Sequence, residues 1–181
     1  MTTDDVRQPR WPWVWLGLAM LWVALARVPL VWHARDHLDS DLAVDGLVLV
    51  EALHGHWRWH YPGTPFSGTV PVLLSLPAAL MNGPSAGALV TGGVVAYELV
   101  LVSVFLLAWR GFGAKVAVWS LVPLAFASVG VVWLSGRITG GHLVSVVWHA
   151  GAFLGLLEVV RRGGVARAAL LGLWCGLGLY V

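Results

Sequence analysis

Long apolar runs constrain the fold of this chain more than any other feature of its sequence. A helix that crosses a bilayer needs about 20 mostly apolar residues. Five runs come close to this length or exceed it, at residues 11–32, 85–109, 116–134, 143–160 and 165–181. The mean hydropathy of +0.80 and the charged fraction of 11% fit a chain surrounded by lipid. The sequence therefore predicts an all-α polytopic membrane protein with about five transmembrane helices.

Composition and charge exclude several other classes. Cys175 is the single cysteine in the chain, so neither a disulfide framework nor a cysteine-based zinc fold can form. A net charge of +2 with 59% hydrophobic residues excludes a disordered chain. The basic residues are scattered at the ends of apolar runs rather than gathered on one face, so we expect no nucleic-acid partner. The partner that the composition indicates is membrane lipid.

A sixth apolar run, residues 69–81, is too short to span a bilayer. It contains Pro71 and Pro77 and is closed by Asn82, Gly83 and Pro84. We expect residues 69–82 to form a helix that lies in the membrane interface.

The two ends of the chain give further expectations. Residues 1–10 resemble the polar start of a signal peptide, but the run that follows is too long for one, which predicts a retained anchor. The last run stays apolar to its final residue. We expect residues 1–181 to form a single transmembrane domain that is the N-terminal part of a longer protein, so that these residues alone need not be active.

Basic residues predict the orientation, because cytoplasmic loops carry an excess of Lys and Arg. If the N-terminus is cytoplasmic, seven of these residues lie inside and three outside. The seven are Arg7, Arg10, Arg110, Lys115, Arg161, Arg162 and Arg167, and the three are Arg35, Arg58 and Arg137. The loop of residues 33–68 and the loop before residue 143 are then both extracytoplasmic. We expect an integral protein of a bacterial inner membrane.

The extracytoplasmic loop of residues 33–68 holds five of the seven histidines and five of the nine acidic residues. Asp39, Asp41 and Asp45 crowd at the start of a predicted helix, with Asp41 and Asp45 one turn apart on one face. Asp39, or Ser40, can cap the helix. Three acids so close together repel one another unless they bind a cation or one stays protonated for chemistry. We therefore expect the Asp39/Asp41 pair to be functional, and a divalent metal ion on it is one hypothesis.

Histidines offer a rival metal site. His54, His56 and His60 follow in the same loop, with His33 and His37 upstream, and neutral imidazole is a common metal ligand. Their spacing matches no ordered metal motif, so we rank this site below the aspartate pair.

Several short stretches, taken in order, resemble a known family. They are Asp39-Ser40-Asp41, Tyr61-Pro62-Gly63, Phe66-Ser67-Gly68-Thr69, the segment from Ala108 to Gly113, and Arg137 with Gly140-Gly141-His142. With the topology, they resemble the N-terminal part of GT-C type membrane glycosyltransferases, closest to the protein-O-mannosyltransferase-like and aminoarabinose-transferase-like enzymes. The resemblance covers nearly the whole chain. Leu42 stands where many relatives have Glu, so Asp39 would supply the second carboxylate.

The resemblance implies an inverting glycosyltransferase of the cell envelope. Such an enzyme moves a sugar from a polyprenyl-phosphate donor to an acceptor glycan, lipid or protein at the outer face. Asp41 would act as the base, with Asp39 beside it, and Arg137 and His142 would hold the donor phosphate. The alternative is a non-enzymatic polytopic membrane protein, such as a small transporter or an assembly subunit.

Two acidic residues lie within the predicted spans. Glu158 is one turn from Arg161 and Arg162, which predicts an ion pair. Glu98 lies in the middle of its span and has no basic residue within reach on the same helix. A carboxylate at that depth indicates either a polar helix contact or an ion pathway.

Overall fold

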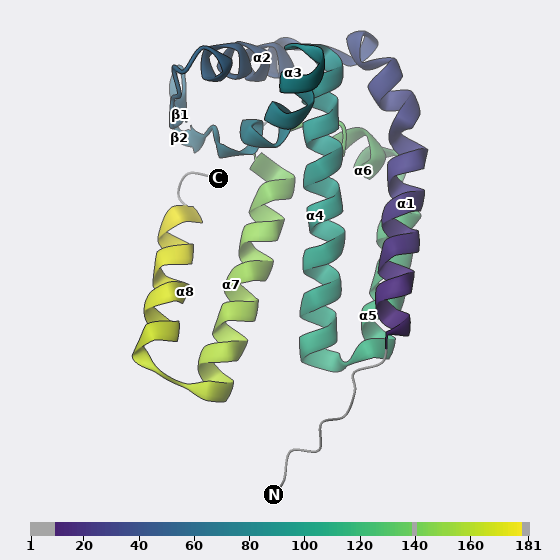
Figure 1. The fold of residues 1–181 in the computed structure, drawn as a ribbon, viewed down its shortest axis with the longest axis vertical. Coiled ribbons are helices and arrows are strands. Elements are labelled where there is room, and N and C mark those ends of the chain that lie inside the picture. Colours follow the sequence, from purple (N-terminus) through teal and green to yellow (C-terminus); the bar gives the residue numbers. More distant parts are fainter. Residues whose placement is uncertain (1–9, 139–140, 179–181) are drawn as a thin grey trace, which may run out of the picture.

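The computed structural model describes residues 10–138 and 141–178, apart from the side chains of residues 64–66. The described chain is mostly helical with one small hairpin, and it confirms the prediction of an all-α polytopic membrane protein (Figure 1). The elements are α1 (Trp11–Trp32), η1 (Ala34–His37), α2 (Ser40–Leu53), β1 (His60–Tyr61), β2 (Thr64–Gly68), η2 (Val70–Ser75), α3 (Leu76–Asn82), α4 (Ala86–Phe112), α5 (Ala114–Ala125), α6 (Val129–Leu134), α7 (His142–Arg162) and α8 (Val165–Leu177).

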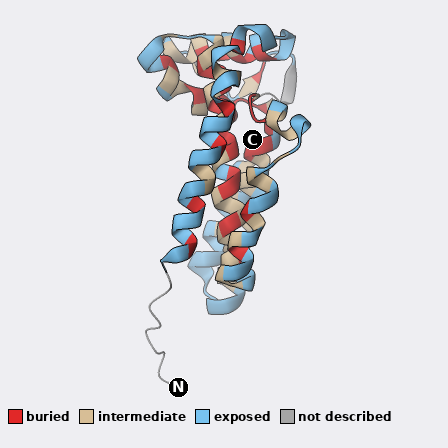
Figure 2. Cartoon of the chain, turned by 90° about the vertical axis from the view of Figure 1, so that its right-hand side faces the viewer, coloured by how far each residue is buried: buried red, intermediate tan, exposed pale blue. Residues whose placement is uncertain are grey.

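In the part of the chain that the structure describes, three helices are long and apolar enough to cross a membrane: α1 with 22 residues, α4 with 27 and α7 with 21. Their outward sides are exposed along much of their length (Figure 2). Leu25 on α1 is 59% exposed and Phe153 on α7 is 57% exposed. Large apolar side chains exposed over so wide a surface indicate contact with lipid rather than water.

Helix α4 lies at the centre of the bundle and packs against α1, α5 and α7. Its inward residues Tyr97, Leu101 and Phe105 are buried together with Val23 of α1. Helix α8 packs against α7, where the rings of Trp148 and Trp174 stack 4.1 Å apart. Each of these indoles donates a hydrogen bond to the other residue's carbonyl.

The predicted span 116–134 is wrong as a single helix. It is divided into α5, which ends at Ala125, and α6, which begins at Val129. Pro123 lies inside α5 and has no N–H to donate, which weakens the helix just before the break. The break leaves two carbonyls in need of donors. Tyr97 Oη bonds the Leu124 carbonyl at 2.7 Å and Trp22 Nε1 bonds the Ala125 carbonyl at 3.1 Å, so irregular backbone is tolerated here.

Of the roughly five predicted spans, three are single helices of sufficient length among the described residues. Helix α5 has 12 residues and α8 has 13, and both are apolar. The predicted span 165–181 ends with residues that lie outside the described part of the chain.

The segments between α1 and α4 run across one end of the bundle (Figure 1). The predicted interface helix 69–82 is two pieces, the 3-10 helix η2 followed by the seven-residue α3. A proline near the start of each piece favours a new helix there. We call this end of the bundle, with α2, the hairpin, η2 and α3, the cap end.

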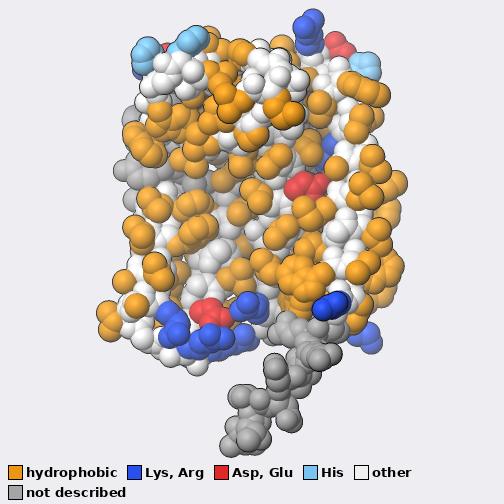
Figure 3. Space-filling model, viewed as in Figure 1, with side chains coloured by type: hydrophobic (Ala, Val, Ile, Leu, Met, Phe, Trp, Pro, Cys, Tyr) orange, Lys and Arg blue, Asp and Glu red, His pale blue; other side chains and the backbone are white. Residues whose placement is uncertain are grey.

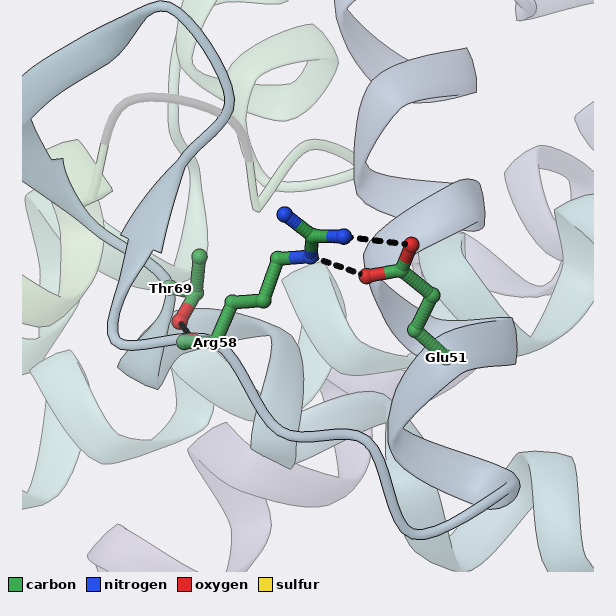
Figure 4. Close-up of polar contacts among 3 residues, drawn as sticks. All are labelled: Glu51, Arg58 and Thr69. Atoms are coloured by element: carbon green, nitrogen blue, oxygen red, sulfur yellow. Dashed lines mark hydrogen bonds and ion pairs between the residues drawn. The ribbon is translucent and has the colours of Figure 1, made fainter.

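One ion pair fixes the hairpin to α2 at the cap end (Figure 4). Arg58 donates from Nε to Glu51 at 2.5 Å and from Nη2 at 3.2 Å, and Thr69 Oγ1 donates to the Arg58 carbonyl. The bond from Thr69 closes the base of the hairpin, and the ion pair ties the segment before β1 to α2.

The opposite end of the bundle carries most of the basic side chains (Figure 3). The start of α1, the α4–α5 turn and the α7–α8 turn all lie there (Figure 1). We call it the basic end; its described Lys and Arg residues are Arg10, Arg110, Lys115, Arg161, Arg162 and Arg167. The connection from α6 to α7 lies toward the cap end instead, so Arg137 is on the same side as the acidic loop.

Candidate functional site

Arg137 joins the two polar loops of the cap end. It follows α6, and only 11% of its side chain is exposed. Its Nη2 forms an ion pair with Asp39 Oδ2 and lies 4.0 Å from Asp41 Oδ2. The guanidinium carbon also lies 4.3 Å from the centre of the Trp133 ring. The structure thus brings together three of the four residues that the sequence proposes for the site.

Asp39 is held from two sides. It is the N-cap of α2, and its Oδ1 accepts a hydrogen bond from the Leu42 amide at 2.9 Å. Its Oδ2 accepts the ion pair with Arg137. The Leu42 amide first, and Arg137 second, hold the pKa of the Asp39 carboxyl below its ordinary value. Asp39 is therefore an ionised anchor that fixes Arg137, and the capping role that the sequence offers for it is confirmed.

Asp41 is the more accessible of the two carboxylates. It lies in the first turn of α2, and 65% of its side chain is exposed, against 42% for Asp39. Its distance of 4.0 Å from Arg137 places it next to a positive charge without a close hydrogen bond to it. Asp41 can therefore accept a proton from a molecule that approaches from outside.

Asp45 differs from the other two acids because its side chain is fully buried. Asp45 lies on the inward stripe of α2 with Leu42 and Leu49, whereas Asp41, one turn earlier, is exposed. Tyr61 Oη donates a hydrogen bond to Asp45 Oδ1. Burial, followed by the charge of Asp45, raises the pKa of the Tyr61 hydroxyl. Asp45 therefore links α2 to the hairpin.

The segment that carries Arg137 is held in place by contacts with α1 and α4, which involve Arg27, Ser135 and Gly93. The buried Arg27 of α1 donates from Nε to Ser135 Oγ at 2.8 Å, and Ser135 Oγ bonds the Val132 carbonyl at 2.5 Å. A Cβ on Gly93 of α4 would lie 2.7 Å from the Arg137 amide nitrogen. The loop backbone thus packs directly on α4.

These three supporting residues are missed by the sequence analysis. Arg27 alone carried a signal, because it is the one charged residue in its apolar run and charges at that depth are costly. Its partner Ser135 is more than 100 positions away, so the pattern could not reveal the contact. Nothing in the sequence distinguishes Gly93 from the other helical glycines.

His142 is not joined to this group. It is the first residue of α7 and is exposed. Its carbonyl accepts a hydrogen bond from Ser145 Oγ at 2.8 Å. Among the described contacts, none connects His142 to Arg137 or to the two aspartates, and Gly140 of the same motif lies outside the described residues.

A divalent ion on Asp39 and Asp41 does not fit this arrangement. Both oxygens of Asp39 already accept from Leu42 and Arg137. A second cation would stand beside the guanidinium and would have to displace it, at an electrostatic cost. Within residues 10–138 and 141–178, no three His, Cys, Asp or Glu side chains are grouped to hold a metal, so the rival histidine site is not assembled either.

A small crevice adjoins the site beside Arg137. It is lined by Leu30, His37, Leu42, Val90, Trp133, Gly136 and Arg137. Its volume of about 10 Å³ is close to that of one water molecule. A ligand larger than a water molecule must therefore approach from the exposed side of Asp41.

The acidic residues within the helices have different surroundings. Glu158 forms an ion pair with Arg162 at 3.1 Å, which is one of the two partners that the sequence predicts. It also forms an ion pair with Arg110 of α4 at 2.8 Å. The Glu98 carboxylate is buried, and neither oxygen has a hydrogen-bond partner among the described residues. The positive charge of Arg27 on α1 interacts electrostatically with the Glu98 carboxylate.

Comparisons with known proteins assign no function to this chain, so its function is inferred from the geometry of the site. No family model, no curated protein and no solved structure matches this chain.

Proposed function

We propose that this protein transfers a sugar from a polyprenyl-phosphate donor to a hydroxyl acceptor at the membrane surface, as an inverting glycosyltransferase of the GT-C type. One observation carries the proposal. The cap end places an accessible carboxylate, Asp41, within 4.0 Å of the guanidinium of Arg137, although the two residues come from distant parts of the chain. A base beside an anion-binding cation is the pair of groups that such a transfer needs.

In the proposed reaction, the acceptor hydroxyl oxygen attacks the anomeric carbon of the donor sugar. Asp41 takes the hydroxyl proton as the new carbon–oxygen bond forms. The bond from the anomeric carbon to the phosphate oxygen breaks, and the electron pair leaves with the polyprenyl phosphate, so the configuration is inverted. Arg137 stabilises the charge that grows on that phosphate.

Arg137 retains donors for this role. A guanidinium has five N–H groups, and its pairs with the aspartates use Nη2. Asp39 fixes the orientation of the guanidinium and leaves Asp41 as the base. His142, the second phosphate residue that the family resemblance suggests, is outside this group and takes no step here.

The direct test replaces Asp41 by Asn. The amide keeps the size of the side chain but cannot take the proton, so transfer should fall by at least 100-fold while membrane insertion is unchanged. The assay follows label from polyprenyl-phosphate donors carrying mannose or aminoarabinose, in membranes that contain the protein. Asp36→Asn is the matched control, because Asp36 is an exposed carboxylate in the preceding turn whose described partner is His33. Equal transfer by wild type and Asp41→Asn contradicts the proposed base.

The orientation is part of the same proposal. We propose that the cap end faces outward from a bacterial inner membrane and that the basic end faces the cytoplasm. In a Cys175→Ser background, a cysteine at the exposed Ser40 should react with an impermeant reagent in intact cells, whereas one at the exposed Lys115 should not. Ser135, though in an outer loop by sequence, is buried and cannot serve as a reporter. If Lys115→Cys reacts and Ser40→Cys does not, the protein has the opposite orientation.

A non-enzymatic membrane protein remains the second candidate, and a specific observation favours it. Asp39 and Arg137 already satisfy each other, and the adjoining crevice holds about one water molecule. A purely structural pair would look the same. The non-enzymatic hypothesis predicts that the purified protein does not bind labelled polyprenyl phosphate. The transferase hypothesis predicts that it does, and that Arg137→Met weakens the binding.

A further inference from the structure

The basic end holds a cluster of arginines that the proposed transfer does not use. Arg110 lies in the last turn of α4, Arg161 and Arg162 lie in the last turn of α7, and Arg167 lies in the first turn of α8. Glu158 is the carboxylate among them, bonded to Arg110 at 2.8 Å and to Arg162 at 3.1 Å. Four positive charges around one negative charge leave a formal charge of +3.

The arginines are held in place while their outer surfaces stay open. Arg161 donates to the Arg110 carbonyl at 2.7 Å, and Arg167 donates to the Gly163 carbonyl at 2.8 Å. These bonds also satisfy carbonyls at the ends of α4 and α7, which have no partner within the helix. The side chains of Arg110 and Arg162 are 54% and 65% exposed. The cluster is therefore an ordered cationic surface and not a closed ion pair.

Two mostly apolar cavities run from this cluster into the bundle on either side of α7. One, of about 210 Å³, lies between α4 and α7 and is lined by Leu106, Leu154 and Leu157 below Arg110 and Arg161. The other, of about 260 Å³, lies between α7 and α8 and is lined by Leu170, Leu171 and Trp174 below Arg167. Gly155 and Glu158 border both cavities. A Cβ on Gly155 would lie 3.1 Å from Leu171 Cδ1, so this glycine lets α8 approach α7 closely beside the second cavity.

We propose that this cluster binds the headgroup phosphate of an anionic phospholipid, with the acyl chains lying in the two flanking cavities. The occupant follows from the combination of features. A free phosphate would use the arginines but not the apolar grooves, and a neutral lipid would use the grooves but gain nothing from the +3 charge. Basic pockets between membrane helices bind anionic headgroups for this reason. The site does not depend on the proposed transfer activity, since it lies at the opposite end of the bundle.

The test measures lipid selectivity with the full chain, purified and reconstituted in bilayers. Spin-labelled phosphatidylglycerol and phosphatidylcholine report, by electron paramagnetic resonance, how strongly each lipid associates with the protein. We expect phosphatidylglycerol to be preferred several-fold. A double variant, Arg161→Gln with Arg167→Gln, should lose most of this preference, because a surface arginine contributes about fivefold to the binding of an anionic lipid.

A second variant keeps the proposal testable if the double variant does not fold. Glu158→Gln removes the negative charge from the cluster and should strengthen the preference for phosphatidylglycerol. Arg35→Gln is the matched control, because Arg35 is an exposed arginine at the cap end. Inorganic phosphate at equal ionic strength should leave the preference unchanged. The proposal is overturned if wild type shows no preference, if Arg35→Gln lowers it as much as the double variant, or if inorganic phosphate abolishes it.

Discussion

The cap end and the basic end both contain arginine–carboxylate pairs, and the two are built in different ways. Arg137 at the cap end is 11% exposed and lies against Trp133, Asp39 and the backbone that packs on α4. Arg110 and Arg162 at the basic end are more than half exposed and share Glu158. A buried guanidinium must be satisfied by fixed partners, whereas an exposed one is free to exchange water for a ligand. The cap end therefore holds its charges in one geometry, and the basic end presents them to the membrane surface.

The two ends also differ in how far neighbouring helices hold their arginines in place. Arg137 depends on contacts from α1, through Arg27 and Ser135, and from α4, through Gly93. The arginines of the basic end depend on bonds to nearby carbonyls and to one acid. Changes to the packing of the bundle should therefore disturb the cap end more than the basic end.

The largest expected effect on stability comes from Gly93→Ala. Its Cβ would lie 2.7 to 2.8 Å from three backbone atoms of residues 135–137, and backbone cannot move aside without shifting the loop. We expect a loss of about 2–3 kcal/mol in the free energy of unfolding, with a weaker Asp39–Arg137 pair. The measurement is unfolding in mixed micelles of dodecyl maltoside and sodium dodecyl sulfate.

Gly111→Ala is the matched control on the same helix. Nothing lies within 4 Å of the Cβ that this change adds, so the protein should be unchanged or up to about 1 kcal/mol more stable. Equal effects of the two substitutions would mean that the loop does not pack on α4 as described, and the contrast between the two ends would lose its structural basis.

Sequence reasoning reached the elements that depend on local pattern. The long apolar runs predict α1, α4 and α7 because length and hydropathy suffice for a span. The break between α5 and α6 was missed, although Pro123 was visible, because the break is tolerated only where Tyr97 and Trp22 supply hydrogen bonds from other helices. The contact that satisfies Asp45 was missed for a similar reason, since its partner Tyr61 comes from the hairpin.

The candidate site was predictable in composition but not in geometry. Topology alone places Asp39, Asp41 and Arg137 on one side of the membrane. The ion pair between Asp39 and Arg137 depends on the path of the α6–α7 connection, which is set by Gly93 and by the bond from Arg27 to Ser135. His142 shares the side but not the cluster, because a shared loop does not fix which side chains meet.

The smallest expected effect compares one arginine from each end. Arg137→Met should lower the free energy of unfolding by about 1–2 kcal/mol at pH 7, a value below that of a fully buried pair because Asp39 is partly exposed. Arg110→Met should lower it by at most about 0.5 kcal/mol, as is usual for an exposed ion pair. Both are measured by the same micelle unfolding assay as Gly93→Ala.

Acidification should reduce the cost of Arg137→Met. The pKa of Asp39 is lower in the folded protein than its ordinary value near 3.9, so its contribution to stability is present above about pH 4 and is lost as the pH falls through the folded value. The difference between wild type and Arg137→Met should therefore shrink when unfolding is measured from pH 7 down to pH 3. An unchanged difference at pH 3, or a cost of Arg110→Met equal to that of Arg137→Met at pH 7, would contradict the assignment of Asp39 as the ionised anchor of the cap end.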